Sequence, residues 1–143
     1  MKRINNMRVV LDTNVLLVSV SRSSKYNWLY QALLDSKYEF LYTTEILLEY
    51  EEIISEKFSP QVANNVIRSI VESKTTFPIT IYYNFNLIHT DTSDNKFVDC
   101  AFAGNANYLV TNDKHFNIVK KNKFPKINVI NIVEFKQILF FEN

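Results

Sequence analysis

The 143-residue chain is poor in the residues that build special loops and cross-links. Its single glycine, Gly104, excludes a glycine-rich phosphate-binding loop. Its single cysteine, Cys100, excludes an intrachain disulfide and is typical of a reducing compartment, so we expect that thiol to be a small core residue. The three prolines, Pro60, Pro78 and Pro125, are expected between secondary-structure elements.

Long apolar segments are also missing. No segment approaches the roughly 18 apolar residues of a membrane helix, and the N-terminal residues lack the apolar run and cleavage site of a secretory signal. We therefore expect a cytoplasmic protein that does not bind a membrane. Because no stretch rich in Gly, Pro or Ser marks a linker, residues 1–143 are predicted to form one domain.

Short runs rich in Val, Ile, Tyr and Phe predict β-strands. They lie at 7–11, 39–43, 79–83, 108–112 and 127–132. Segments of helical periodicity lie at 25–35, 44–57, 61–73, 94–106 and 131–141, the last opening on Asn131 as N-cap with Glu134 three residues on. This alternation predicts an α/β fold, a three-layer α/β/α sandwich around a mostly parallel sheet of four or five strands. Ligands bind such sheets outside the carboxyl ends of the strands.

Two aspartates directly follow predicted strands. Asp12 ends the run "VVLD" and Asp113 follows "YLVTN", so both are expected at the same edge of the sheet. Each of them is also at a position where turn and helix-cap aspartates are common. Two close carboxylates repel each other unless a cation lies between them. Asn14 and Thr111 are short polar neighbours that are able to hydrogen-bond these carboxylates.

The stretch "IHTDTSDNKFVDCA" contains three further aspartates. At about 100° per residue, a helix beginning near Asp94 places that side chain on the same face as the apolar core residues. The same phase places Asp99 on the opposite, solvated side. Asp91 precedes the helix and cannot be phased. Helix capping is the alternative role for Asp94, although Thr92 and Ser93 are available as caps instead.

The glutamate-rich segment 44–57 is divided in the same way. Glu45 and Glu52 lie opposite its apolar stripe and are expected in solvent. Glu49 and Glu51 flank the stripe on its two sides, and periodicity does not choose between them.

Asp12, Asp94, Asp113 and one of these glutamates are thus predicted to share a cleft. Oxygen ligands favour Mg²⁺ or Mn²⁺ over zinc, and the chain has only two histidines, His89 and His115. Acid clusters that hold such cations catalyse phosphodiester hydrolysis, because the cation activates water and stabilises charge on the phosphate oxygens.

Charge is segregated although the net charge is only +1. Residues 114–126 contain five lysines, among them Lys114, Lys120 and Lys121, whereas residues 45–56 contain five glutamates. A basic patch near an acidic cleft is typical of an enzyme that acts on nucleic acid. A solvated basic face that serves only solubility is the simpler interpretation of the same lysines.

The segments "VVLDTNVL", "TTEILLEYEEII" and "DTSDNKFVDCAFAGNANYLVTNDKHF" together resemble the PIN-domain ribonucleases, and most of all the toxin halves of bacterial toxin–antitoxin pairs. The resemblance extends from about Met7 to Ile138. It assigns the four acids of the family to Asp12, Glu49, Asp94 and Asp113, and so selects Glu49 over Glu51. Asn14 and Thr111 match polar positions near the family's site, and Asp91 is an additional acid beside it.

The resemblance implies a metal-dependent endoribonuclease that hydrolyses phosphodiester bonds of single-stranded RNA. Asp12, Glu49, Asp94 and Asp113 would bind Mg²⁺ or Mn²⁺ and form the catalytic centre, with Asn14, Thr111 and Asp91 around it. Lys114, Lys120 and Lys121 would contact the RNA backbone. The expected partners are RNA, a cognate antitoxin protein and a second copy of the chain in a homodimer.

Two alternatives remain open from the sequence. One is an enzyme that transfers phosphoryl groups through the aspartate after the first strand, on a flavodoxin-like or haloacid-dehalogenase-like fold. Leu11 and Asn14 occupy the positions where such sites usually carry a second acid. The other is a non-catalytic module that binds RNA or protein. Four carboxylates facing one cleft argue against the latter, because they repel each other without a cation.

Overall fold

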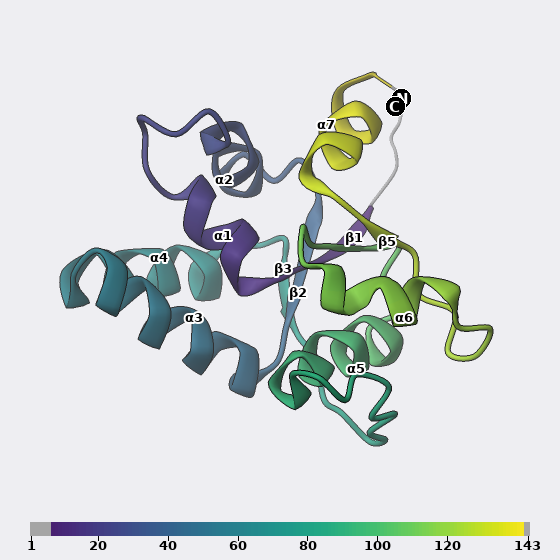
Figure 1. The fold of residues 1–143 in the computed structure, drawn as a ribbon. Helices are drawn as coiled ribbons and strands as arrows, with labels where there is room; N and C mark the ends of the chain where they lie inside the picture. The colour runs from purple at the N-terminus through teal and green to yellow at the C-terminus, as the bar shows by residue number, and fades with distance from the viewer. Residues whose placement is uncertain (1–6, 142–143) are drawn as a thin grey trace.

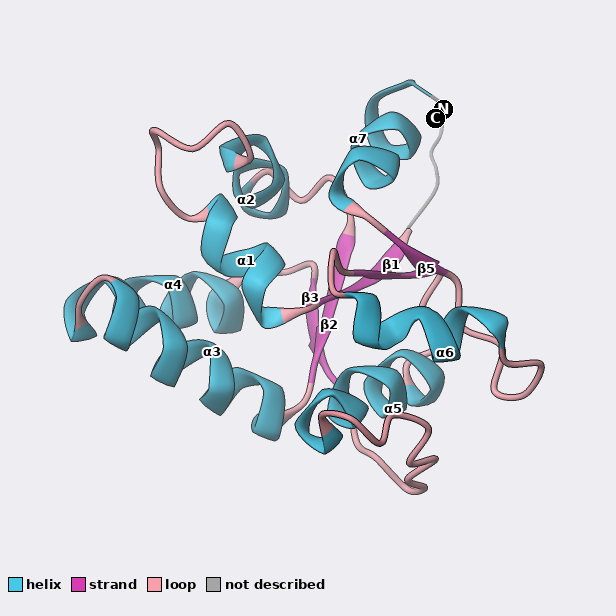
Figure 2. Ribbon diagram, viewed as in Figure 1, coloured by secondary structure: helices cyan, strands magenta, loops and turns pink. Residues whose placement is uncertain are grey.

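The computed structural model describes residues 7–141; the first six and last two residues of the predicted domain lie outside the described part of the chain. The strands are β1 (Arg8–Leu11), β2 (Glu39–Tyr42), β3 (Thr76–Pro78), β4 (Tyr108–Val110) and β5 (Val129–Ile130). They form one five-stranded sheet in the order β3-β2-β1-β4-β5, and each neighbouring pair is parallel. Figure 2 shows the strands, in magenta, between the helices. The predicted α/β fold with a parallel central sheet is confirmed.

Helices connect the strands and cover both faces of the sheet. They are α1 (Thr13–Ser19), α2 (Asn27–Leu34), α3 (Thr44–Lys57), α4 (Pro60–Glu72), α5 (Asn95–Ala103), α6 (Asn117–Lys121) and α7 (Ile132–Phe141), with 3₁₀ turns η1 (Thr92–Asp94) and η2 (Lys114–Phe116). Figure 1 shows α1, α3 and α4 on one side of the sheet and α5 and α6 on the other. None of the helices in the described part of the chain is long and apolar enough to cross a membrane.

Local sequence signals explain where the helices begin. Thr43 and Ser59 accept hydrogen bonds from backbone N–H groups in the first turns of α3 and α4. Asn131 and Glu134 form the predicted capping box before α7: the Asn131 N–H donates to Glu134 Oε1 at 2.9 Å, and the Glu134 N–H donates to Asn131 Oδ1 at 2.8 Å. Cys100 is completely buried in α5, as expected.

Three expectations for the chain's course are wrong. The third strand is Thr76–Pro78 and not 79–83, because α4 ends at Glu72 and the chain pairs with β2 directly after the turn. Pro78 is the last residue of that strand rather than a residue between elements. It is tolerated there because β3 is at the edge of the sheet. Pro60 likewise lies inside an element, as the first residue of α4, where its missing N–H costs nothing.

The Ile79 N–H still donates to the Tyr42 carbonyl of β2 at 2.7 Å, and residues 80–90 then run over α5 outside any strand. The N–H of Ile88 donates to Asn95 Oδ1 at 2.9 Å, and Asn95 Nδ2 donates back to the Ile88 carbonyl at 2.8 Å. Phe85 packs edge-to-face on Phe102, with 4.7 Å between ring centroids. The segment therefore covers a face of α5 that would otherwise be exposed to solvent.

Candidate active site

The predicted acids gather where the strand order changes direction, between β1 and β4. Asp12 follows β1 and Asp113 follows β4, and these two strands are neighbours in the sheet. The Asp12 N–H donates to the Val110 carbonyl at 3.0 Å and so extends the pairing of the two strands. This position at the carboxyl edge is the ligand-binding location of open α/β sheets.

Asp12 is a buried carboxylate, only 4% exposed. Thr111 Oγ1 donates to Asp12 Oδ2 at 2.7 Å and accepts from the Asp113 N–H at 3.0 Å, so one hydroxyl links both strand ends. Burial raises the pKa of Asp12, the Thr111 hydrogen bond lowers it, and the negative charges of Asp113 and Glu49 raise it further. Although Asp12 is at the N-cap of α1, its side chain makes no capping hydrogen bond. The capping alternative therefore does not account for this residue.

Asp94 points inward as predicted and is 8% exposed. Its Oδ2 atom is buried without a hydrogen-bond partner. Burial raises the pKa of Asp94 to about 6, with further contributions from the negative charges of Asp12, Asp91, Asp113 and Glu49. The four predicted acids and Asp91 are therefore electrostatic neighbours, and the negative charges of the other four all raise the pKa of Asp94.

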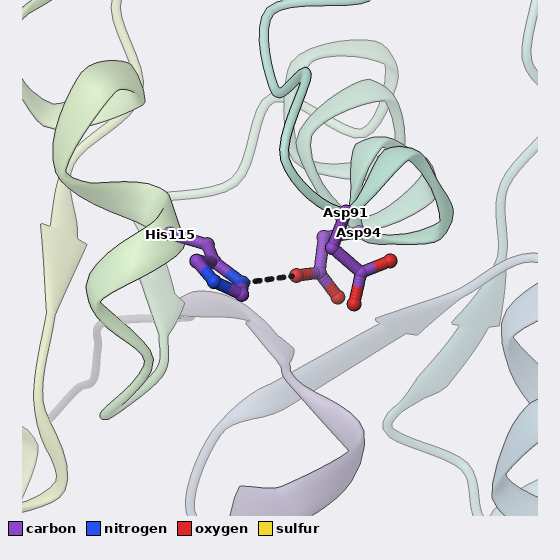
Figure 3. Close-up of side chains that lie close together, drawn as sticks. All are labelled: Asp91, Asp94 and His115. Atoms are coloured by element: carbon purple, nitrogen blue, oxygen red, sulfur yellow. Dashed lines mark ion pairs between the residues drawn. The ribbon is translucent and has the colours of Figure 1, made fainter.

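Asp113 is half-buried and belongs to the same cluster of acids. Its Oδ1 accepts the N–H of His115 at 2.9 Å. The His115 ring points toward the acids, and its Nδ1 lies 3.4 Å from Asp113 Oδ1. The same nitrogen lies 3.7 Å from Asp94 Oδ2 (Figure 3). The sequence identified His115 only as one of two available nitrogen ligands, and nothing in its spacing placed it here.

Glu49 reaches the site from α3, whereas Glu51, Glu45 and Glu52 are exposed. Thr13, in the first turn of α1, donates a short hydrogen bond to Glu49 Oε2. Lys96 Nζ lies 2.6 Å from Glu49 Oε1, and its side chain is only 9% exposed. Sequence reasoning missed Lys96, because a lysine in the first turn of a helix is ordinarily solvated. Glu49 is thus the one acid in the cluster that a protein cation already neutralises.

The three residues expected around the centre lie beside it in different ways. Thr111 makes the hydrogen bond to Asp12 described above. Asn14 is exposed and lines, with Asp12 and Asp113, a cavity of about 300 Å³. Asp91 caps η1: its Oδ1 accepts from the Ser93 N–H at 3.2 Å and from Ser93 Oγ at 2.7 Å. The Ser93 side-chain hydrogen bond is the largest of the contributions that lower the pKa of Asp91.

Asp99 is not the solvated residue that helical phase predicts. It is 5% exposed, and its Oδ1 accepts the N–H of Phe85 at 3.1 Å. Burial raises the pKa of Asp99, and the Phe85 hydrogen bond opposes that rise. The error arises because the segment 79–90 covers the outer face of α5. Asp99 lies outside the group of charges that perturbs Asp94.

The predicted basic residues extend away from the acids along η2 and α6. Lys114 and Lys120 line, together with Asp113, a hollow of about 390 Å³. Lys120 and Lys121 line a second hollow of about 640 Å³ with Lys123 and Lys126. Because Lys120 borders both hollows, a basic surface runs from the edge of the acid cluster.

Comparison with known proteins agrees with this arrangement. A model of the PIN domain family matches residues 8–115, which contain Asp12, Glu49, Asp94 and Asp113. The chain belongs to the PIN domain family. The match ends at His115, so the basic helix α6, β5 and α7 lie beyond the matched part of this PIN domain protein. No curated protein matches the chain.

Three solved structures share the PIN fold of this chain at low sequence identity. VapBC2 from Rickettsia felis, bound to a DNA fragment from its promoter, has a TM-score of 0.61 at 17% identity, covering 87% of this chain and 98% of the other. VapC20 from Mycobacterium tuberculosis, a Sarcin-Ricin loop cleaving toxin, has a TM-score of 0.58 at 8% identity, with coverages of 76% and 92%. DNA-bound VapBC from Salmonella typhimurium has a TM-score of 0.57 at 15% identity, with coverages of 88% and 98%.

Proposed function

We propose that the protein is a metal-dependent endoribonuclease that hydrolyses phosphodiester bonds of single-stranded RNA, and that it is the toxin of a toxin–antitoxin pair. The observation that carries the proposal is the buried Asp94 Oδ2, which has no hydrogen-bond partner and lies among four other carboxylates. Such a cluster is stable at neutral pH when a cation offsets its charge. Membership of the PIN domain family and the fold shared with VapC20 support the reaction type.

The roles that we assign to individual residues follow from their contacts. Asp12, Glu49, Asp94 and Asp113 would hold Mg²⁺ or Mn²⁺. Such a cation, when bound, supplies a Lewis acid for the phosphate and lowers the pKa of a water nucleophile. Thr111 fixes the Asp12 carboxylate through its hydroxyl. Lys96 offsets the charge of Glu49, and that salt bridge would restrict how far Glu49 reaches toward the cation.

RNA would approach over the basic surface on η2 and α6. Lys114 and Lys120 border the same hollow as Asp113. When one phosphate of the RNA lies beside the acids, these lysines would therefore contact the adjacent phosphates of the backbone. Lys121 continues the surface farther from the acids. Each lysine that contacts a phosphate makes binding more sensitive to salt.

The partners that we propose are a cognate antitoxin and a second copy of the chain, in the cytoplasm. Two of the structures with this fold are VapBC assemblies bound to DNA. The described part of the chain leaves apolar residues exposed on α7, with Val133 72% and Phe141 70% exposed. Replacement of both by Asp is expected to turn a dimer into a monomer in sedimentation analysis. A monomeric wild-type chain would contradict the dimer.

The test of the nuclease is cleavage of end-labelled single-stranded and duplex RNA with Mg²⁺ or Mn²⁺. Loss of contacts around a metal site typically costs 10–100-fold, so Asp94→Asn is expected to reduce the cleavage rate by at least about 100-fold. Glu49→Gln and Glu51→Gln form a matched pair on one helix, and only the former is expected to impair cleavage. Activity that persists in EDTA contradicts the metal mechanism, and a covalent aspartyl-phosphate would favour phosphoryl transfer instead.

A further inference from the structure

The tightest group of potential metal ligands in residues 7–141 is not the set of four predicted acids. Asp91, Asp94 and His115 each offer one ligand atom, and these atoms all lie within 4.8 Å of one another. Figure 3 shows the imidazole of His115 facing the Asp94 carboxylate, with Asp91 beside it. No other group of three such donors approaches this closely within the part of the chain that the structure describes.

The Asp94 oxygen that faces the histidine has no hydrogen-bond partner. Asp94 Oδ2 is buried and accepts no hydrogen bond. His115 Nδ1 lies 3.7 Å away, which is too long for a hydrogen bond. Buried polar atoms nearly always have a partner, so an unpaired carboxylate oxygen opposite an imidazole nitrogen points to a ligand between them.

The Asp91 carboxylate is oriented by hydrogen bonds from Ser93. Both hydrogen bonds to its carboxylate, from the Ser93 N–H and Oγ, use Oδ1. Its Oδ2 atom is therefore open to a ligand, and the side chain is oriented before any ligand arrives. Metal sites depend on this kind of outer hydrogen bond to fix their ligands.

We propose that His115 and Asp91 complete a mixed nitrogen–oxygen metal site with Asp94, and that this site selects a first-row transition-metal ion over Mg²⁺. Imidazole is a poor ligand for Mg²⁺ and a good one for transition metals, whereas a cluster of oxygen ligands alone favours Mg²⁺ or Mn²⁺. The inference rests on the proposed nuclease centre, because Asp94 belongs to both. It narrows the expected cofactor from Mg²⁺ or Mn²⁺ to a first-row transition-metal ion whose binding also needs His115.

The chain's histidine count gives the test an internal control. His89 and His115 are the only two histidines, so NMR spectra of the ring nitrogens contain signals from just two side chains. One equivalent of Zn²⁺, used as a diamagnetic probe, is expected to shift the His115 signals and to leave those of exposed His89 in place. This measurement uses the wild-type protein and does not depend on the folding of a variant.

Calorimetric titration with Zn²⁺ and with Mg²⁺ measures the selectivity. His115→Ala and Asp91→Asn are each expected to weaken Zn²⁺ binding by about tenfold or more, and to weaken Mg²⁺ binding less. His89→Ala, the matched histidine control, is expected to bind both ions as the wild type does. Because the His115 side chain is 46% exposed, its replacement is not expected to disturb the core.

Zn²⁺ affinity that is unchanged in His115→Ala, or equal shifts of both histidines, would overturn the proposal. Cleavage of RNA by the wild type with Mg²⁺ or with Mn²⁺ is scored separately. A protein that binds Zn²⁺ through His115 but cleaves no RNA contradicts the nuclease alone. A protein that cleaves RNA but binds Zn²⁺ without His115 contradicts the metal site alone.

Discussion

Asp94→Asn is predicted to make the metal-free protein more stable at neutral pH, although it removes a residue of the candidate active site. The ionised Asp94 carboxylate is buried, has an unpaired oxygen and is surrounded by four other acids. An asparagine fills the same space without the charge. The substitution therefore removes the cost of burying the charge, together with the repulsion from the neighbouring acids, and leaves the packing intact.

The pKa of Asp94 gives the size and the sign of the effect. A pKa of about 6 in the folded protein against 3.8 in the unfolded chain corresponds to about 3 kcal/mol, at 1.36 kcal/mol per pH unit. Water and salt at the open side of the cluster screen the repulsion, so we expect about 1–2 kcal/mol. Because the folded-state pKa is raised, the contribution of Asp94 to the stability of the wild type is fully present below pH 3.8 and is lost as the pH rises through about 6.

The assay is urea unfolding in EDTA at several pH values. The free energies of unfolding of Asp94→Asn and the wild type are expected to differ little near pH 4. At pH 7.5 the free energy of unfolding of the variant is expected to be about 1–2 kcal/mol higher than that of the wild type. Asp35→Asn, at an exposed position after α2, is the control for a general effect of charge. A variant no more stable than the wild type at pH 7.5 would refute the reasoning, as would a difference that does not change with pH.

Three further predictions concern the surroundings of the site. Tyr50→Phe leaves the Leu11 carbonyl without the Tyr50 hydroxyl that donates to it at 2.5 Å, and should cost about 1–3 kcal/mol in urea unfolding; an unchanged midpoint would contradict this. Asp99→Ala should accelerate hydrogen exchange at the Phe85 amide, whereas Asp99→Asn, which keeps an acceptor oxygen, should not. Burial raises the pKa of Cys100 to about 12, so a thiol reagent should label it only after unfolding; rapid labelling of the native protein would contradict the buried assignment.

The sequence was sufficient for the fold and for the positions of the acids at strand ends. Asp12 and Asp113 each follow a short apolar run, and parallel strands bring their carboxyl ends to one edge of a sheet. This reasoning needs only the order of the elements. It does not reveal side chains that arrive from elsewhere, and His115 and Lys96 were missed for that reason. Lys96 contacts Glu49, and His115 contacts Asp113. Each of them lies on a turn at the start of a helix, and sequence periodicity does not predict the direction of such a turn.

The two clearest errors, the strand at 79–83 and the solvated Asp99, have one cause. The run "ITIYY" has the residue types of a strand, but β3 is complete by Pro78. The residues after it pass over α5 instead and place the Phe85 N–H against the Asp99 carboxylate. Helical phase treats a helix as having one buried face, and it fails when a segment without regular structure covers the other.

Glu49 shows how the core decides what periodicity leaves open. Glu49 and Glu51 flank the apolar stripe of α3 symmetrically, and Tyr50 lies between them. The Tyr50 side chain is completely buried, and its hydroxyl donates to the carbonyl of Leu11, the residue immediately before Asp12. This bond fixes the rotation of α3 against the end of β1, so Glu49 faces Thr13 and the acids while Glu51 faces solvent. One buried tyrosine thus determines which of the two glutamates faces the acids. Loss of the hydrogen bond from Tyr50 to Leu11 should therefore disturb the acid cluster as well as the core.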